Sequence, residues 1–242
     1  MKESILDDFF PIWKNSQYKL HKVIRWSDYL EDGIGENMMK QSTLQHSFSF
    51  SIFADMCVLL LQPHMQNSLK KDLNEALLHR AFTLHDLAEG LTKNGDIIAS
   101  KKTYADDLEE YIAFKEHFSK IRKNVFSKLE YAFLLQFAQD NPNCFPEKAR
   151  LIMSKIYDVH YYEVIAFKAL ERFEYLFYPI WMQEKHPYLL TWVIRRNLPK
   201  YQEYAQRLPG FREELFTFSL EEWMQDFLKQ NSNVPNQESK VA

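Results

Sequence analysis

Two histidines and several carboxylates are the residues of this sequence that could do chemistry together. His46 lies about one turn into an apolar helical segment, and the adjacent pair His85-Asp86 lies near the end of a second one. Imidazole nitrogens and carboxylate oxygens form a mixed ligand set that suits a divalent first-row metal ion, with positions left open for water and substrate. These residues are therefore candidates for a metal site.

Two further acidic residues accompany this set. On a helix, Glu89 would share a face with His85 (i, i+4) and with Asp86 (i, i+3), and Asp158 interrupts a long apolar segment. Singly, these residues have ordinary explanations: a histidine on an apolar helix face is more often a hydrogen-bonded core residue, and an aspartate in a long helix usually faces solvent. The stronger signal is their order, in which a histidine is followed 39 positions later by His-Asp, and that aspartate 72 positions later by Asp158.

The segments that carry these residues have the features of helices. Residues 42–45 are Ser-Thr-Leu-Gln, a capping box in which Ser42 caps the helix and Gln45 reaches back. Residues 72–75, Asp-Leu-Asn-Glu, form a second such pattern and predict the helix of His85-Asp86, with Gly90 as its C-terminal stop. In the first helix, over 42–61, apolar side chains recur at every fourth position and predict one apolar stripe: Leu44, Phe48, Ile52, Met56 and Leu60.

The rest of the chain is also helical in its periodicity. Residues 104–137 predict one or two amphipathic helices, and residues 147–178 predict one long helix that contains Asp158. A third capping box, at 219–222, predicts the start of the last helix. Prolines divide the region between into shorter helices: Pro179, Pro187, Pro199 and Pro209. No segment alternates as a strand does, so the sequence predicts an all-α fold.

Composition excludes several classes of function. The 242 residues include only five glycines, and neither G-x-G-x-x-G nor G-x-x-x-x-G-K-[ST] can be formed from them, which excludes the glycine-cradled nucleotide folds. The 30 Lys+Arg and 33 Asp+Glu residues give a net charge of −3. A balanced charge offers no basic face for general binding to nucleic acid polymers.

The sequence also bears on where the protein resides. Its first twenty residues include Asp7 and Asp8 and do not resemble a signal peptide. The most apolar stretch, 52–61, contains Asp55 and is about half as long as a bilayer-spanning helix. Two cysteines, Cys57 and Cys144, are too few for a disulfide scaffold and favour a reducing compartment. We therefore expect a soluble, cytoplasmic protein with no membrane partner.

The order His, His-Asp, Asp resembles that of the HD-domain phosphohydrolases. The local sequence resembles the 5′-deoxynucleotidase branch of that superfamily, and the resemblance covers about residues 20–180. It depends on Ile-Arg-Trp at 24–26, Leu-Gln-His-Ser at 44–47, His-Asp-Leu-Ala-Glu-Gly at 85–90, Gly-Asp-Ile at 95–97, and Lys102. It implies an HD-domain helical bundle with additional C-terminal helices. We expect a core over 1–185, a helical extension over 186–230 packed on it, and a flexible tail over 231–242.

The resemblance also implies roles for single residues. It gives one divalent metal ion (Mn, Co, Fe, Mg or Zn) four ligands: His46, His85, Asp86 and Asp158. Glu89 matches the acidic residue that positions or activates the attacking water, and Asp96 matches a second active-site carboxylate. Three residues match substrate contacts: Arg25 and Trp26 for the nucleotide and its deoxyribose, and Lys102 for the phosphate, a role for which Lys101 competes.

Two features depart from the family pattern. The family commonly has Glu immediately before the first metal-binding histidine, and this chain has Gln45, which changes the surroundings of the ligand. The segment between Glu89 and Gly95 is longer than usual, which affects the placement of Asp96.

The resemblance implies a 5′-nucleotidase that releases phosphate from deoxynucleoside 5′-monophosphates with metal-activated water. The alternatives are a deoxynucleoside triphosphohydrolase or a phosphatase of another nucleotide-like metabolite, and, from a different class, a catalytically silent HD module used for binding. The implied partners are a small-molecule nucleotide and a second copy of the chain in a homodimer.

Overall fold

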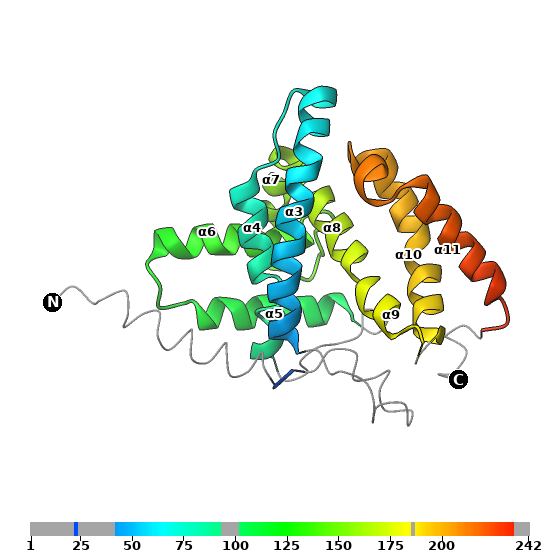
Figure 1. The fold of residues 1–242 in the computed structure, drawn as a ribbon. Coiled ribbons are helices and arrows are strands. Elements are labelled where there is room, and N and C mark those ends of the chain that lie inside the picture. The colour runs from blue at the N-terminus through cyan, green and yellow to red at the C-terminus, as the bar shows by residue number, and fades with distance from the viewer. Residues whose placement is uncertain (1–21, 24–41, 93–101, 185–186, 235–242) are drawn as a thin grey trace. The chain divides into compact units, whose positions relative to one another are not determined.

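The computed structural model describes residues 22–23, 42–92, 102–184 and 187–234. In these ranges the chain forms α-helices and no β-strand, which confirms the predicted all-α fold (Figure 1). The helices are α3 (Thr43–Leu69), α4 (Glu75–Leu84), α5 (Tyr104–His117), α6 (Lys123–Leu134), α7 (Glu147–Val159), α8 (Tyr161–Glu174), α9 (Phe177–Met182), α10 (Pro187–Arg207) and α11 (Phe218–Gln230).

Local side-chain hydrogen bonds fix several helix starts. The predicted capping box at the start of α3 is present: the Ser42 amide donates to Gln45 Oε1 at 2.9 Å, and the Gln45 amide donates to Ser42 Oγ at 3.3 Å. The other two predicted boxes are wrong in position. α4 begins only at Glu75, so Asp72 does not cap it. The N-cap of α11 is Thr217, whose Oγ1 accepts from the Leu220 amide at 3.2 Å.

The predicted long helix over 147–178 is wrong, because it is divided into α7, α8 and α9. At His160 the backbone leaves helical geometry, with φ −120° and ψ 39°, and this residue ends α7. Asp158 consequently lies in the last turn of α7 instead of the middle of a continuous helix.

The buried face of α3 differs from the predicted apolar stripe. Four of the five stripe positions are exposed: Phe48, Ile52, Met56 and Leu60. The buried face carries a second apolar set: Phe50, Ala54, Cys57, Val58, Leu61 and Met65. The helix is apolar on both faces, so its periodicity alone could not select the one that packs in the core.

α3 is also long and apolar enough, by length and composition alone, to cross a membrane. It has 27 residues, and an 18-residue window within it has a mean hydropathy of 1.4 with 33% of the window buried. The core helix of a soluble protein passes the same test. The expected absence of a membrane span therefore stays a prediction.

The chain divides into two compact units, of which the first comprises Met1–Ile52 and Ala76–Val164. Its core is aromatic: Phe114 stacks on Phe133 with ring centroids 4.2 Å apart. The hydroxyl of Tyr111, also buried, donates to Glu130 Oε1 at 2.8 Å. Within this unit α6 packs against α7, and α5 packs against the 3₁₀ turn at Glu89–Leu91. That turn follows α4 and carries part of the candidate site.

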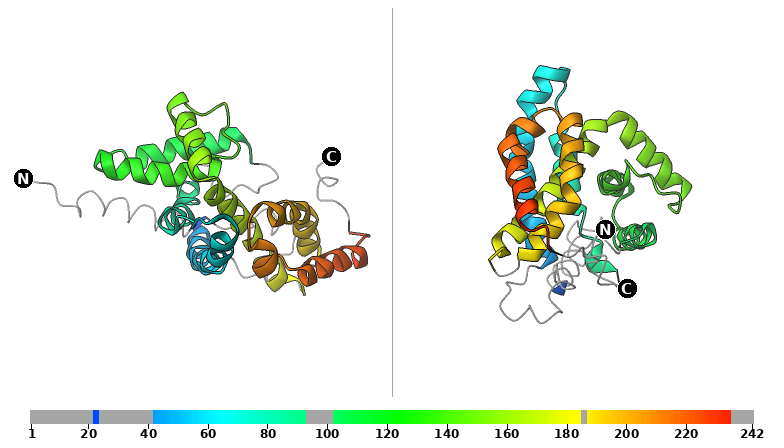
Figure 2. Two further views of the ribbon diagram at one scale, coloured as in Figure 1. Left: turned by 90° about the horizontal axis from the view of Figure 1, so that it is seen from above. Right: turned by 90° about the vertical axis from the view of Figure 1, so that its right-hand side faces the viewer.

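The second unit comprises Phe53–Glu75 and Ile165–Ala242. Within it, α10 packs against α9 and α11, and α11 runs back along α10 (Figure 2). Gly210, at φ 84°, is in the left-handed region, and a Cβ there would lie 2.8 Å from the Cβ of His64, so only glycine fits. This division differs from the predicted boundary at 185/186, and the predicted domain organisation stays a prediction. At the start of the predicted flexible tail, Val234 is buried and its carbonyl accepts from Arg195 at 3.3 Å.

Candidate metal centre

His46 reaches the site from the first turn of α3. Its amide donates to the Ser42 carbonyl at 2.9 Å, so the capped start of the helix fixes its backbone. The imidazole is buried and stacks on Phe50, one turn further along, with ring centroids 5.9 Å apart. The rings of Phe50 and His85 are packed edge to face, with ring centroids 4.9 Å apart. One buried phenyl ring thus holds both histidines in place.

His85 and Asp86 lie immediately after α4, which ends at Leu84. The chain here turns tightly: the Leu87 amide donates to the Leu84 carbonyl at 3.1 Å, and the Glu89 amide donates to the Asp86 carbonyl at 3.1 Å. The expectation that one helix would carry His85, Asp86 and Glu89 is therefore wrong. The tight turn replaces the last helical turn and presents His85 and Asp86 toward α3.

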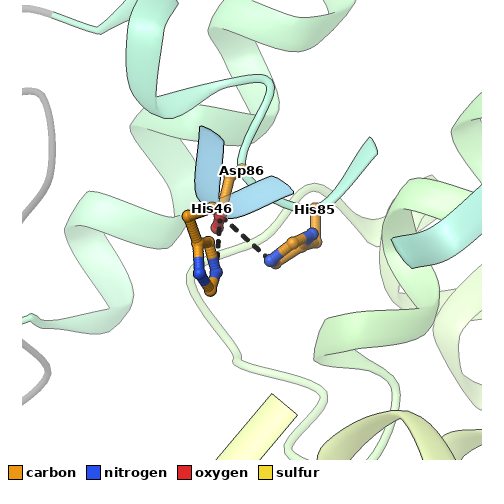
Figure 3. A group of neighbouring side chains, drawn as sticks. All are labelled: His46, His85 and Asp86. Atoms are coloured by element: carbon orange, nitrogen blue, oxygen red, sulfur yellow. Dashed lines mark ion pairs between the residues drawn. The ribbon is translucent and has the colours of Figure 1, made fainter. Parts of the chain in front are cut away.

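The three side chains converge on one point (Figure 3). Asp86 Oδ2 lies 3.2 Å from His46 Nε2 and 3.0 Å from His85 Nε2. One ligand atom from each of the three residues lies within 4.8 Å of the others. The exposed fractions are 2% for His46, 3% for His85 and 6% for Asp86. This is the arrangement of a buried N/N/O group that could hold a metal ion.

The hydrogen bond at the other nitrogen of His85 sets its tautomer. Nδ1 lies 2.7 Å from the Phe82 carbonyl oxygen. Because a carbonyl oxygen only accepts, Nδ1 must carry the proton, and in the neutral ring the lone pair is then on Nε2, the atom that faces Asp86. Metal-ligating histidines typically donate their second nitrogen in this way. Gln136 Nε2 adds a further restraint by donating to the His85 carbonyl at 3.4 Å.

Two hydroxyl groups of α3 lie close to the carboxylates of Asp86 and Glu89. Ser47 Oγ, which donates to the Thr43 carbonyl at 2.8 Å, lies 3.5 Å from Asp86 Oδ2, and Thr43 Oγ1 donates to Glu89 Oε2 at 3.5 Å. Glu89 is buried, as the proposed role near a reacting water requires. The start of α3 therefore supplies His46 and two contacts to the acidic residues.

Lys102 lies in a carboxylate environment. Its Nζ is 2.7 Å from Glu110 Oε1 and 3.6 Å from Asp107 Oδ1. Burial alone would lower the pKa of Lys102, but Glu110 and Glu89 outweigh burial and raise that pKa above its usual range. Burial raises the pKa of Glu110 to about 7, although Lys102 opposes this shift, and Asp86 contributes to it. The ammonium group stays charged.

Glu110 is the site residue that the sequence did not reveal. It is buried although it lies in a helix with many surface charges. The available signal was spacing: Glu110 and the buried Phe114 stand four residues apart and share the inward face of α5.

Asp158, the fourth ligand that the resemblance implies, is not brought into the three-residue group. It is exposed in the last turn of α7. Arg25, Trp26, Asp96 and the competing Lys101 lie outside the described residues. Their predicted roles, and that of Asp158 as a ligand, stay predictions.

The residues present fit a divalent ion. Two imidazoles and one carboxylate match the three protein ligands typical of catalytic sites, in which the remaining positions serve water and substrate. The His85 tautomer also directs a lone pair into the group.

No family model, curated protein or solved structure matches the chain. Function must therefore be inferred from the residues of this chain.

Proposed function

We propose that the chain is a metal-dependent phosphohydrolase of the HD-domain type, a 5′-nucleotidase that releases phosphate from deoxynucleoside 5′-monophosphates. The observation that carries the proposal is the buried group of His46, His85 and Asp86, with both Nε2 atoms within 3.2 Å of one carboxylate oxygen. The hydrogen bond from His85 Nδ1 to Phe82 supports a ligand role, because it selects the tautomer that a metal ion requires.

The chemistry follows from the needs of phosphomonoester hydrolysis. A divalent ion in this group would neutralise charge on a phosphoryl oxygen and lower the pKa of water. Glu89, a buried carboxylate three residues after Asp86, would orient the attacking water and accept its proton. Lys102, which is paired with Glu110 at 2.7 Å, would add positive charge near the phosphate.

The nucleotide part of the proposal depends on the sequence resemblance. Arg25 would bind phosphate or sugar oxygens through its planar guanidinium group, and Trp26 would place an apolar wall against the deoxyribose. Asp96 would act as a second carboxylate. The proposal includes a cytoplasmic location, a homodimer and one divalent ion as cofactor.

A substrate panel tests the proposed function. The full-length chain, loaded separately with Mn²⁺, Co²⁺, Zn²⁺ and Mg²⁺, is assayed for phosphate release from deoxynucleoside and ribonucleoside monophosphates and from deoxynucleoside triphosphates. Phosphate release from the deoxynucleoside monophosphates is expected. Release of triphosphate from a triphosphate substrate would support the triphosphohydrolase instead, and a metal-loaded protein inactive on the whole panel would be a silent binding module.

The variant Glu89→Gln sharpens the assay because it removes the proposed proton acceptor while keeping the shape of the side chain. Its turnover should fall by a factor on the order of 10²–10⁴, the usual contribution of a general base. The matched control is Glu109→Gln, an exposed glutamate on α5, which should retain wild-type turnover. Equal activity of the two variants would exclude Glu89 as the base.

A further inference from the structure

The ion pair between Lys102 and Glu110 is a feature that the ligand set does not explain. Lys102 lies one residue before the N-cap of α5, and Glu110 lies in the second turn of that helix. Their charged atoms are 2.7 Å apart, and the Glu110 side chain is only 3% exposed. The Glu110 carboxylate must lose most of its hydration, whereas the side chain of Lys102 is 24% exposed and keeps part of its own. Burying one charge of an ion pair in this way can cost more than the mutual attraction returns. Its presence therefore calls for a reason other than the stability of the fold.

The start of α5 is built to deliver Lys102 to this position. Thr103 caps the helix, and a reciprocal capping box with Asp106 fixes the direction in which the chain enters: the Thr103 amide donates to Asp106 Oδ2 at 2.8 Å, and the Asp106 amide donates to Thr103 Oγ1 at 3.4 Å. Lys102 immediately precedes this fixed point. Asp106 is thus engaged in the cap, and Asp107 is 3.6 Å from the ammonium. Glu110 is left as the close partner of Lys102.

Glu110 is only partly satisfied by this contact. Its Oε1 meets Lys102, whereas its Oε2 is buried and has no hydrogen-bond partner among the described residues. A glutamate with a merely structural role at this depth would be expected to have both oxygens bonded. An unbonded carboxylate oxygen at this depth indicates a role other than stabilising the fold.

The Lys102–Glu110 pair interacts electrostatically with carboxylates of the candidate metal centre. The charge of Glu89 acts on Lys102, and the charge of Asp86 acts on Glu110. The 3₁₀ turn that carries Glu89 packs against α5, so these groups lie alongside one another within the first unit. Lys102 and Glu110 thus belong to the same unit as the turn that carries Glu89.

We propose that Glu110 is a positioning residue of the phosphohydrolase site: its carboxylate, 2.7 Å from Nζ, holds the ammonium of Lys102 at the start of α5, the helix that packs against the turn carrying Glu89, so that it can meet the phosphate. This inference rests on the proposed function for the identity of the anion, but the placement of Lys102 by Glu110 can be tested without activity. Glu110 itself touches neither substrate nor metal in this role.

Competitive acetylation of the full-length chain tests the placement directly. An amine reacts with acetic anhydride only in its neutral form, and mass spectrometry after reaction at trace concentration gives the rate at Lys102 relative to Lys70, an exposed lysine of the same chain. In the wild-type protein Lys102 should react more than tenfold more slowly than Lys70. In Glu110→Gln its rate should rise about tenfold, which corresponds to one pKa unit. In the control Glu109→Gln it should be unchanged.

If burial alone made Lys102 unreactive, its acetylation rate would stay slow in Glu110→Gln. That outcome overturns the inference. A wild-type rate equal to that of Lys70 overturns it as well and needs no variant. An activity assay distinguishes a failure of this inference from a failure of the proposed function. With deoxynucleoside monophosphate, kcat/KM of Glu110→Gln should fall about tenfold while the acetylation rate rises. A changed acetylation rate in a protein that hydrolyses no phosphate ester would contradict the proposed function and leave the placement of Lys102 intact.

Discussion

The carboxylate of Asp86 lies 3.2 Å from Nε2 of His46, a residue of the first turn of α3. Two local structures create this contact: the capped first turn of α3 holds His46, and the tight turn after α4 holds Asp86. His85 joins them at 3.0 Å from the same carboxylate oxygen. A metal site at this point thus depends on the packing of α3 against the end of α4.

Phe50 should be essential to that packing. It is fully buried between His46, His85 and Phe82. Truncation in Phe50→Ala leaves a cavity and should lower the free energy of unfolding by about 3–5 kcal/mol. The control Phe48→Ala removes the same side chain from the same helix, where it is 67% exposed, and should change stability by no more than about 0.5 kcal/mol. Urea unfolding measures both, and equal losses would show that α3 buries its other face.

Glu110 gives stability a specific dependence on pH. Its pKa, raised by burial from 4.5 to about 7, means that the folded state binds this proton more tightly than the unfolded state does. The contribution of Glu110 to stability is therefore greatest below pH 4.5 and is lost as the pH rises through 7. In Glu110→Gln this dependence is absent, so the stability of the variant relative to wild type should rise as the pH increases from about 4.5 to about 7. Denaturant unfolding at several pH values measures the difference. A flat difference, like that expected of the exposed Glu109→Gln, would contradict this account.

The two cysteines should differ sharply in reactivity. Burial raises the pKa of Cys57 to about 12, and its side chain is in the core of the second unit, whereas Cys144 is exposed. Because the thiolate is the reactive form, one thiol per chain should react with Ellman's reagent at pH 8 in the folded protein and two after unfolding. Cys144→Ser should abolish the folded-state reaction. Rapid reaction of two thiols in the folded protein would show that the buried face of α3 is open to solvent.

Asp158 should matter less to metal binding than Asp86 does. Asp158 is exposed and is not a member of the three-residue group, whereas Asp86 is at its centre. Asp86→Asn should weaken the affinity for Mn²⁺ or Co²⁺ by more than about 100-fold, and Asp158→Asn by less than about tenfold. Isothermal titration of the metal-free protein with each ion measures both. If Asp158→Asn lost affinity as strongly as Asp86→Asn, Asp158 would be a ligand, as the sequence order suggested.

The helices could be predicted because their signals are local, and the three central residues because their order resembles that of a known family. The Ser42–Gln45 capping box, the apolar periodicity and the lack of strand patterns depend on residues within a few positions of one another. The order of His46 and His85-Asp86 likewise marked the side chains that the structure brings within 4.8 Å of each other.

Features decided by tertiary packing could not be predicted in this way. α3 has apolar residues on both faces, so Phe48 and Phe50 look equivalent in sequence, yet one is exposed and the other is in the core. The end of α7 at His160 depends on a backbone change that no proline or glycine announces. Glu110 resembles a surface charge until Lys102, eight positions earlier, is found against it.

The metal content of the purified chain tests the central claim most directly. The wild-type protein, depleted with a chelator and titrated with Mn²⁺, Co²⁺ or Zn²⁺, should bind one ion per chain. His85→Ala should lose that site, whereas His79→Ala, an exposed histidine on the preceding α4, should bind as wild type does. Wild-type metal affinity and stoichiometry in His85→Ala would contradict the metal centre and, with it, the proposed phosphohydrolase.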